Sequence, residues 1–412
     1  MDNAATLGSV LDRSSAAEAT MIVGNKVEAV VVRATHDLAE VEAVWRGLEA
    51  QGIESPGQSF DFIREWIAAH RIAPANTLFV TASLGGHPMA LLALYRRRRG
   101  VTLYSWFPGA HVGCGAPLLD RQRFATLDDA GRADFWRQVM AGIRGADLVY
   151  LKAVPERAYG LETPFARIGR SLPTETLYRA SFASWEEANT TQRSKSRRKH
   201  DRQQGERLDA LGKVEFEAIS GKDAAAPEVL ATMFRQRAER FKVMGVGDPF
   251  SADDIARFYD ATVGPESTVP VKLHVLRLDG EIVAVRYNIV HGDRLFCLIS
   301  SMSDDPRIQG GSPGKQCLLR VMQSVFDEGF RTFDMGGGFT DEKRHWCNEQ
   351  IALRNHYVPL TPAGFAVITA HGAWMSARAR VKSNPTLLKW AKAIRTRLHR
   401  AQETAPAPAE AE

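Results

Sequence analysis

The segment from Arg307 to Lys315, Arg-Ile-Gln-Gly-Gly-Ser-Pro-Gly-Lys, combines residue types that suit the binding of a phosphate group. Gly310 and Gly311 let a ligand approach the backbone closely, because glycine has no side chain to block it. Ser312 suits the cap of a helix and Pro313 its first turn, so we expect unpaired amide hydrogens to point at one place, which attracts phosphate. An ordinary capped turn without a ligand is the alternative for the same residues.

Elements with clear periodicity flank this segment. Leu295 to Ser301 predicts a strand, and apolar residues spaced three and four apart from Cys317 to Phe326 predict a helix that ends at Gly329. A further strand is predicted from Phe330 to Asp334. The P-loop and dinucleotide-binding patterns are both absent. Strand, glycine turn, helix and strand in this order form a unit that can hold a pyrophosphate at the start of the helix.

A hairpin signal precedes this unit, and the whole pattern occurs twice. Asp279-Gly280 separates two strand-like runs between Val271 and Asn288. Gly85-Gly86 separates a similar pair between Leu78 and Tyr95, and a third strand, a helix and a fourth strand follow. Gly113-Cys-Gly-Ala-Pro117 takes the place of the turn in this first copy, but no helix follows it directly. We therefore expect two similar units, of which the first has lost the cofactor site.

Three meandering strands, a glycine turn, a helix and a further strand resemble the core of the GNAT acyltransferases. The turn of that family, Gln/Arg-x-x-Gly-x-Gly/Ala, is matched by Arg307 and Gly310, whereas Ser312 departs from it. The doubled arrangement, with Phe333-Asp334 and Lys343-x-x-Trp346, resembles the acetyltransferase domain of the CelD-type proteins associated with cellulose and exopolysaccharide synthesis. More distantly, the chain is similar to the Fem-type peptidoglycan aminoacyltransferases, which take the acyl group from aminoacyl-tRNA.

The resemblance implies an α/β fold, layered as α+β, with tandem GNAT-like units, a mixed sheet and flanking helices. We expect the units to be separated by a basic helix and followed by a second one. The expected regions are a disordered segment (1–26), a first, degenerate unit (27–185), a basic connecting helix (186–212), a second unit that binds acyl-CoA (213–370), a basic amphipathic helix (371–400) and a disordered tail (401–412).

The resemblance also implies the chemistry. Acetyl-CoA or another acyl-CoA would be the co-substrate, no metal would be needed, and an amine would attack the thioester directly. Holding two reactants together is a large part of such catalysis, and one oxyanion donor is worth about 2.7 to 4 kcal/mol in other enzymes. The resemblance places that donor on a backbone amide near Leu298 to Ser300. The expected cofactor-binding residues are Leu298, Ser300, Arg307, Gln309, Gly310, Gly311, Ser312, Gly314 and Lys315.

A second group of residues is expected to move protons and bind the acceptor. Asp334, Glu342 and His345 are candidate proton acceptors, although a carboxylate would need a raised pKa or a water relay near neutral pH. Asp334 suits a structural cap equally well, and Tyr287 or Ser300 is a candidate for reprotonating the thiolate. The expected substrate-binding residues are Lys343, Trp346, Arg197 and Arg198, with a core position as the favoured alternative for Trp346 and a solvated helix face for the arginines.

Basic residues gather in two segments of a chain whose net charge is +5. Arg193 to Arg207 has seven Lys or Arg and two acids, and Arg378 to Arg400 has eight with no acid. The remainder is therefore acidic, which argues against a nucleic-acid-binding surface. The second segment predicts a basic amphipathic helix that docks on the body or rests on an anionic membrane.

Composition indicates an intracellular enzyme. The 412 residues, 44% of them hydrophobic, suffice for two domains with cores. No apolar run approaches the ~20 residues of a membrane helix, and the first residues do not form a signal peptide. The four cysteines, which fit neither a zinc nor a disulfide pattern, are Cys114, Cys297, Cys317 and Cys347.

These observations predict a cytoplasmic acyl-CoA-dependent N-acyltransferase whose acceptor is a small molecule or saccharide, with an amino sugar or polysaccharide precursor preferred. Two alternatives stay open. One is a Fem-type aminoacyltransferase that uses the segment from Arg193 to Arg207 on RNA. The other is a non-catalytic adaptor of a membrane polysaccharide synthase, peripheral to the inner membrane and anchored by the C-terminal helix.

Overall fold

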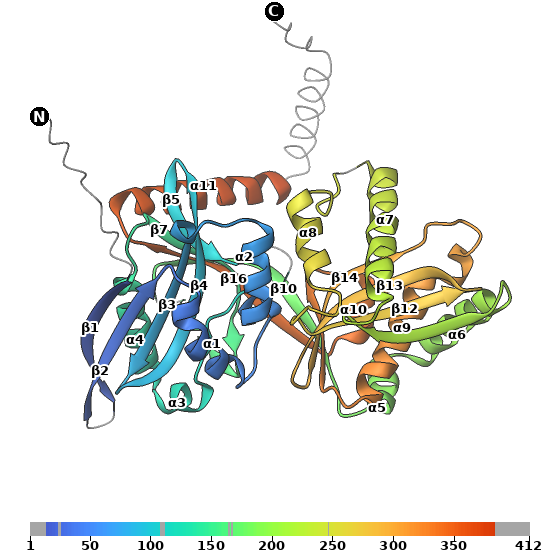
Figure 1. Cartoon of the computed structure of the whole chain (residues 1–412), viewed down its shortest axis with the longest axis horizontal. Helices are drawn as coiled ribbons and strands as arrows, with labels where there is room; N and C mark the ends of the chain where they lie inside the picture. The colour runs from blue at the N-terminus through green and yellow to red at the C-terminus, as the bar shows by residue number, and fades with distance from the viewer. Residues whose placement is uncertain are drawn as a thin grey trace, which may run out of the picture.

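The structure is a computed structural model that describes residues 14–23, 26–107, 112–163, 165, 168–245 and 247–383. These residues form two lobes that lie side by side in Figure 1, joined by strands that run between them. Parallel and antiparallel pairs occur in one sheet, and helices cover it. The predicted α/β fold with a mixed sheet and flanking helices is confirmed.

The first lobe carries helices on a sheet whose apolar side chains meet Phe135 and Trp136, both fully buried. Its strands are β1 (Ser14–Val23), β2 (Lys26–Thr35), β3 (Thr77–Leu84), β4 (His87–Arg99), β5 (Val101–Trp106), β6 (Leu118–Leu119) and β7 (Leu148–Pro155), with a separate pair, β8 (Arg157–Ala158) and β9 (Leu161–Glu162). Its helices are η1 (Ala39–Val41), α1 (Glu42–Glu49), η2 (Pro56–Gln58), α2 (Phe60–Ala69), η3 (Pro74–Asn76), α3 (Arg121–Thr126) and α4 (Asp129–Gly142).

The second lobe repeats the order of the first. Its strands are β11 (Val214–Ser220), β12 (Val271–Leu278), β13 (Glu281–His291), β14 (Arg294–Met302) and β15 (Thr332–Gly337). Its helices are α7 (Ala226–Met244), α8 (Asp253–Ala261), η5 (Gln309–Gly311), α9 (Pro313–Asp327) and α10 (Asp341–Trp346). Two helices, α5 (Trp185–Thr191) and α6 (Lys195–Asp209), precede it where one connecting helix was predicted.

The two predicted hairpins form at the predicted turns. β3 pairs with β4 around Gly85-Gly86, and β12 pairs with β13 around Asp279-Gly280. All four turn residues have positive φ, the conformation that a two-residue hairpin turn of type I′ requires. The glycines and the aspartate at these turns therefore set the register of both hairpins.

Two long strands cross between the lobes. β10 (Arg170–Ser181) pairs with β15 of the second lobe, and β16 (Glu349–Pro359) pairs with β7 of the first. The two also pair with each other, so the order is β1-β2-β3-β4-β5-β7-β16-β10-β15-β14-β13-β12-β11. The expected boundaries at residues 185 and 370 therefore do not separate two independent sheets.

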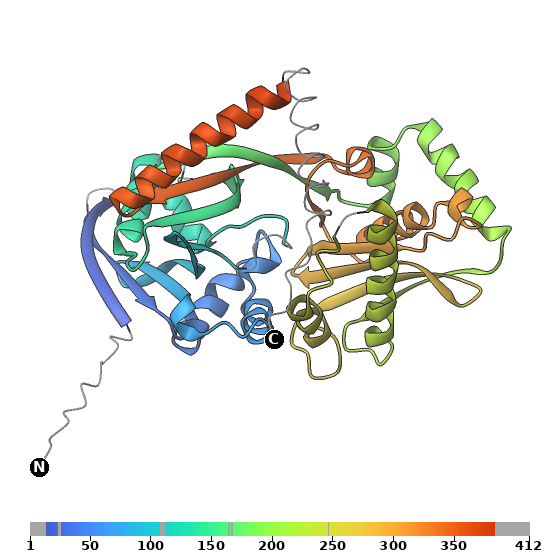
Figure 2. The same ribbon diagram turned by 90° about the horizontal axis from the view of Figure 1, so that it is seen from above.

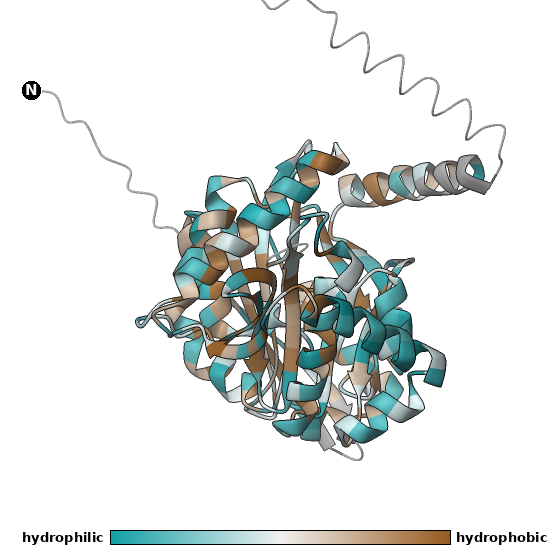
Figure 3. Cartoon of the chain, turned by 90° about the vertical axis from the view of Figure 1, so that its right-hand side faces the viewer, coloured by the Kyte–Doolittle hydropathy of each residue, from teal (hydrophilic) through white to brown (hydrophobic). Residues whose placement is uncertain are grey.

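Aromatic side chains join the lobes on one face of this sheet. Phe62 and Trp66 of α2 each lie 4.9 Å, between ring centroids, from Phe258 of α8. Such pairs stabilise by about 0.5 to 1.5 kcal/mol beyond the area they bury. In Figure 3 the central strands are mainly hydrophobic, and the helices that face the viewer carry many hydrophilic residues. One apolar core thus spans both lobes.

The chain ends differ from expectation. Residues 14–23, expected to be disordered, form β1, which pairs with β2 along its whole length and extends the sheet by one strand. α11 (Pro362–Ser383) starts before the predicted helix at 371 and runs along the outside of the first lobe in Figure 2. Residues 384–412 lie outside the described part. No described helix has the length and hydrophobicity to cross a membrane, and the four cysteines are free.

Candidate active site

β14 and β15 are parallel neighbours that pair at only three positions. The register runs from Arg294 opposite Thr332 to Phe296 opposite Asp334. Beyond that point the two strands have no pairing with each other, although β14 continues to Met302. Their facing backbone groups can therefore bond an extended ligand, as a strand would. We call this space between Cys297–Met302 and Met335–Gly337 the strand gap.

A β-bulge lies at the start of the strand gap. Tyr287 of β13 pairs with Ile299, and the next residue, Asn288, pairs with Cys297, so Leu298 is an extra residue in β14. A bulge re-aims the backbone at one point and is common beside active sites. The bulge falls in the segment, Leu298 to Ser300, for which the oxyanion donor was predicted.

The predicted phosphate turn forms η5 and the start of α9. The amide of Gly311 donates to Ile308 O and that of Ser312 to Gln309 O, each at 3.0 Å, so these two groups are satisfied internally. In the described structure the amides of Gly310 and Gly314 have no hydrogen-bond partner. A Cβ added at Gly310 would meet no atom within 4 Å. The turn therefore offers an open approach at Gly310 rather than at every amide.

Helix α6 packs against one side of this turn, and its contacts give Ser312 and Gly311 roles that the sequence did not predict. Ser312 precedes α9 with φ of +49° and makes no capping bond, because its hydroxyl accepts from Gln204 Nε2 at 2.7 Å. Ser312 is thus the N-cap residue of α9, as predicted, but its side chain does not cap the helix. A Cβ on Gly311 would lie 2.8 Å from Leu208 Cβ, so the close packing of α6 demands this glycine.

Three other predicted cofactor residues surround the turn. The Arg307 side chain is 85% exposed and pairs with Asp305 at 2.6 Å. Gln309 Nε2 donates to Ser303 O at 2.8 Å, which ties the turn to the end of β14. Lys315 is half-buried in the first turn of α9. Arg307, which pairs with the partly exposed Asp305, can swing toward an anion at little cost.

Lys343 holds the glycine loop that follows β15. Its ammonium donates to the carbonyls of Gly336, Gly337 and Gly338 at 3.2, 2.6 and 2.9 Å. An ammonium has three donors, so none is left for an anionic substrate group. Burial lowers the pKa of Lys343. The structure thus replaces the expected substrate contact of Lys343 with a support for one edge of the strand gap.

Arg286 and Glu342 lie beside the strand gap. Arg286 is 6% exposed, and its Nη1 lies 3.8 Å from the sulfur of Cys297 in β14. Its Nη2 lies 3.6 Å from Glu342 Oε2. Burial lowers the pKa of Arg286, but the nearby thiols and Glu342 outweigh it and raise the pKa overall. The Glu342 side chain is partly exposed, so this carboxylate can meet both solvent and a ligand.

Asp334 is committed to a buried ion network. Its Oδ2 lies 2.8 Å from Arg179 Nε, and its Oδ1 accepts from the amide of Gly336 at 2.8 Å. Arg179 also pairs with Glu54 of the first lobe at 2.8 Å, and Glu54 lies 3.3 Å from Arg294. Both oxygens of Asp334 are engaged and the residue is 4% exposed. This geometry supports the structural alternative for Asp334 rather than proton abstraction.

Tyr287 and His345, two further acid-base candidates, differ in access. Tyr287 is fully buried, and its hydroxyl donates to Thr262 Oγ1 at 2.7 Å, so it cannot reach a thiolate in the strand gap in this structure. His345 is half-buried on α10. Burial, followed by the charges of Arg197 and Arg344, lowers its pKa. A neutral imidazole at pH 7 is therefore expected for His345.

The other expected substrate-binding residues are engaged inside the protein. Trp346 is buried, lies 6.0 Å from the Trp185 ring and carries the Arg193 guanidinium over its face, as the favoured core alternative predicted. Arg197 Nε pairs with Asp201 at 3.1 Å. Arg198 donates to the carbonyls of Asn189 and Arg193. The structure brings none of the three to the strand gap.

Sequence reasoning missed Arg179, Glu54 and Arg286. Arg286 interrupts an apolar strand, which is a weak signal that a charged side chain is buried and paired, whereas β10 around Arg179 is mainly polar and gives no such signal. Glu54 lies in an irregular loop, and nothing near it in the sequence indicates a partner 125 residues away.

Comparison with known proteins agrees with this geometry. Residues 195–344, which include the turn, the strand gap and Lys343, match the family model of an acetyltransferase (GNAT) domain. The second lobe is therefore similar to a GNAT acetyltransferase domain. No curated protein matches the sequence.

Two solved structures share the two-lobed fold. The superposition on FemX covers 81% of this chain and 98% of the FemX chain, with 11% sequence identity and a TM-score of 0.52. The second structure is the C-terminal domain (DUF2156) of a protein assigned as a lysylphosphatidylglycerol synthetase from Agrobacterium fabrum. The superposition covers 81% of this chain and 96% of that domain, with 13% sequence identity and a TM-score of 0.50. These comparisons support the GNAT and Fem-like resemblance, and the finer likeness to CelD-type proteins stays a prediction.

Proposed function

We propose that the chain is an acyl-CoA-dependent N-acyltransferase in which an amine attacks the thioester directly. The strand gap between β14 and β15 carries this proposal. The bulge at Leu298 lies at one end of the gap, and the approachable amide of Gly310 follows its other end. The reactive centre and the phosphate site are thus separated along strand β14. An acyl donor must therefore have a long linker between its thioester and its diphosphate, as acyl-CoA has.

Each part of the site has a distinct task in this mechanism. The thioester comes with the acyl-CoA co-substrate. The start of α9, with Arg307 and Lys315 beside it, binds the diphosphate, because helix N-termini attract phosphate. The bulged backbone at Leu298 donates to the developing oxyanion, which pre-arranged donors stabilise. Lys343 keeps the glycine loop apart from β14, so that the strand gap stays open.

Proton removal from the amine is assigned to Glu342, through a water molecule. Its carboxylate is partly exposed and lies beside the strand gap, whereas Asp334 and Tyr287 are sealed in the interior. His345 is the second candidate, since its lowered pKa leaves it able to accept a proton near neutral pH. The acceptor class, an amino sugar or polysaccharide precursor, rests on the resemblance to CelD-type proteins.

Calorimetry with acetyl-CoA tests the donor site. Gly310→Asp places a negative charge at the diphosphate, and we expect binding at least ~10-fold weaker, about 1.4 kcal/mol. Gly310→Ala is the matched control: its Cβ meets no atom within 4 Å, so affinity should stay close to wild type. Gly311→Asp would instead disturb the packing of Leu208. Equal affinity of wild type and Gly310→Asp, or no binding by either, would remove the proposal.

A Fem-type aminoacyltransferase is the second candidate function. The FemX-like fold favours it, as do four exposed basic residues on α6, namely Lys195, Lys199, Arg202 and Arg207. Binding of aminoacyl-tRNA at this helix would fall steeply as salt rises. A screen of CoA release against amines and amino sugars, run beside a tRNA-binding titration in salt, separates the two functions.

A further inference from the structure

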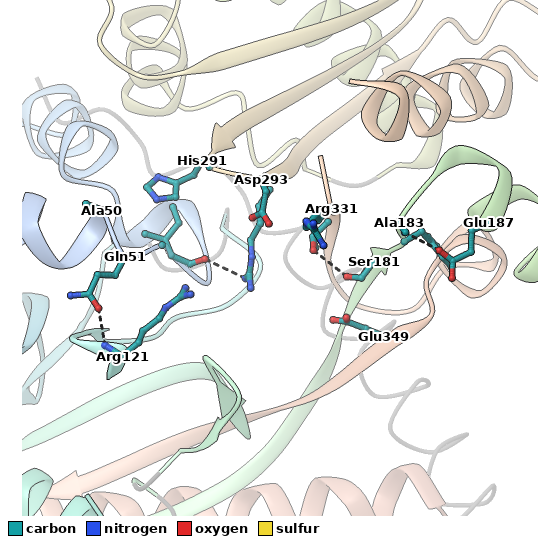
Figure 4. Close-up of a pocket in the computed structure, with 16 residues that line it drawn as sticks. Ala50, Gln51, Arg121, Ser181, Ala183, Glu187, His291, Asp293, Arg331 and Glu349 are labelled. Atoms are coloured by element: carbon teal, nitrogen blue, oxygen red, sulfur yellow. Dashed lines mark hydrogen bonds between the residues drawn. The ribbon is translucent and has the colours of Figure 1, made fainter. Parts of the chain in front are cut away.

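A cavity of about 630 Å³ opens between the lobes, apart from the strand gap. The first lobe lines it with the loop at residues 50–53 and with Arg121 at the start of α3. The second lobe contributes the turn at residues 291–294 and Arg331. In Figure 4, Gln51, Arg121 and His291 lie on one wall, while Arg331, Ser181 and Glu349 lie on the other.

This cavity is not the diphosphate site described above. It lies at Arg294, the first residue of β14, whereas the phosphate turn follows Met302, the last residue. Eight residues of strand separate these two ends, which corresponds to about 26 Å at ~3.3 Å per residue. A single diphosphate cannot occupy both places.

Arg121 is held at the cavity wall in a fixed position. Its backbone amide donates to Gln51 Oε1 at 3.0 Å, and its guanidinium lies 4.3 Å from the centre of the Tyr159 ring. Gly52 has φ of +104°, and a Cβ there would lie 2.6 Å from Arg121 Nη2. Glycine at position 52 therefore supplies both the unusual backbone conformation and the space that this guanidinium needs.

The charge of Arg121 has no counter-ion among the residues that the structure describes. In the described part of the chain no carboxylate forms an ion pair with it, and two of its guanidinium nitrogens, Nε and Nη2, are buried without a hydrogen-bond partner. Arg294 adds a second cation, bonded to Ile53 O at 3.3 Å and paired with the buried Glu54. The exposed Arg331 adds a third, again with no ion-pair partner among the described residues.

The acidic residues of the cavity are in a different environment. Asp293, Glu349 and Glu187 are exposed, and Glu187 accepts from the amide of Ala183 at 2.8 Å. Water solvates exposed carboxylates at little cost, whereas a partly desolvated guanidinium without a partner gains much from an oxyanion. The asymmetry favours a negatively charged ligand near Arg121.

We infer that this cavity binds a small phosphate monoester, with its phosphate held by Arg121, Arg294 and Arg331. A dianionic phosphate suits three cations better than a carboxylate does, because each guanidinium offers a fork of donors to its oxygens. The cavity volume lies in the range of small-molecule sites and accommodates a sugar phosphate. The bound molecule touches both lobes, so it also stabilises their arrangement.

Calorimetry with inorganic phosphate, glucosamine 6-phosphate and glucosamine, at low salt, tests this inference. We expect the two phosphates to bind the wild type, and Arg331→Gln to weaken them while leaving any binding of glucosamine at the acceptor site unchanged. Arg121→Gln and Arg331→Gln should each weaken glucosamine 6-phosphate at least ~10-fold, about 1.4 kcal/mol. Arg331 is exposed, so its replacement leaves the fold intact and makes this variant the decisive one.

The control is Arg137→Gln on α4, which removes an exposed guanidinium far from the cavity lining and should bind as wild type does. Gly310→Asp should also retain phosphate binding, which separates this inference from the acyl-CoA proposal. Absence of phosphate binding by the wild type, or wild-type affinity for glucosamine 6-phosphate in Arg331→Gln, would overturn it.

Discussion

At the scale of single residues, burial decides which acidic groups are free to do chemistry. Asp334 and Glu342 lie eight positions apart, and both are carboxylates near the strand gap. Arg179 and the Gly336 amide engage both oxygens of Asp334, whereas Glu342 has one loose partner, Arg286, at 3.6 Å. Asp334 therefore has no oxygen left to contact a substrate, whereas the partly exposed Glu342 does.

Glu342→Gln tests the assignment of the proton acceptor. The amide keeps the shape of the side chain but cannot take a proton, so we expect kcat/KM to fall by about 100-fold, the lower range of general-base effects. Acetyl-CoA affinity, measured by calorimetry, should be unchanged. Asp334→Asn serves as the comparison and should lower stability more than activity. Full activity of Glu342→Gln would transfer the role to His345.

At the scale of elements, the strand gap depends on what holds its two edges. Strand β14 is fixed by β13, and the loop after β15 is fixed by Lys343, which bridges three successive carbonyls. Helix α6 packs against one side of the phosphate turn, with Leu208 next to Gly311 and Gln204 donating a hydrogen bond to Ser312. The gap therefore depends on neighbouring elements, namely strand β13, Lys343 of helix α10 and helix α6.

Lys343→Met tests this support. The apolar chain keeps the packing but leaves the carbonyls of the glycine loop without their donor, so we expect a loss of about 1 to 3 kcal/mol in unfolding free energy. Acetyl-CoA should also bind more weakly, because one edge of the gap loosens. Urea denaturation and calorimetry measure the two effects. Lys222→Met, at an exposed position, is the control, and equal behaviour of both variants would contradict the role given to Lys343.

At the scale of the whole molecule, the lobes are joined in two ways. The crossing strands β10 and β16 make the sheet continuous. Arg179 then links Glu54 of the first lobe to Asp334 of the second in a buried network. Burial raises the pKa of Glu54, but the charges of Arg179 and Arg294 outweigh it, so its pKa lies below the ordinary value. The network therefore makes the joining of the lobes sensitive to acid.

The pH dependence follows from that direction. A carboxylate with a lowered pKa in the folded state contributes stability that is complete above its unfolded pKa of about 4.3 and is lost as the pH falls through the lower folded value. We expect Glu54→Gln to cost about 3 to 5 kcal/mol at pH 7, because Arg179 and Arg294 lose a buried partner. Below pH 4 its deficit should shrink.

Urea denaturation at pH 7 and at pH 3.5 measures this effect. The control is Glu42→Gln, which removes an exposed pair with Arg46 on α1 and should cost at most about 1 kcal/mol. A deficit of Glu54→Gln that stays constant between the two pH values would contradict the assignment of the pH dependence to Glu54.

Local patterns in the sequence determined the order of the elements and the position of the glycine turn. The hairpins at Gly85-Gly86 and Asp279-Gly280 and the helix after Pro313 were predictable, because turn residues and apolar spacing act over a few neighbouring positions. Tertiary structure alone decided that β10 and β16 cross between the lobes. It also decided that Arg179 forms an ion pair with Asp334, and that Leu208 packs closely against Gly311. Each of these joins segments more than 100 residues apart, and no local pattern specifies which distant partner a buried group will meet.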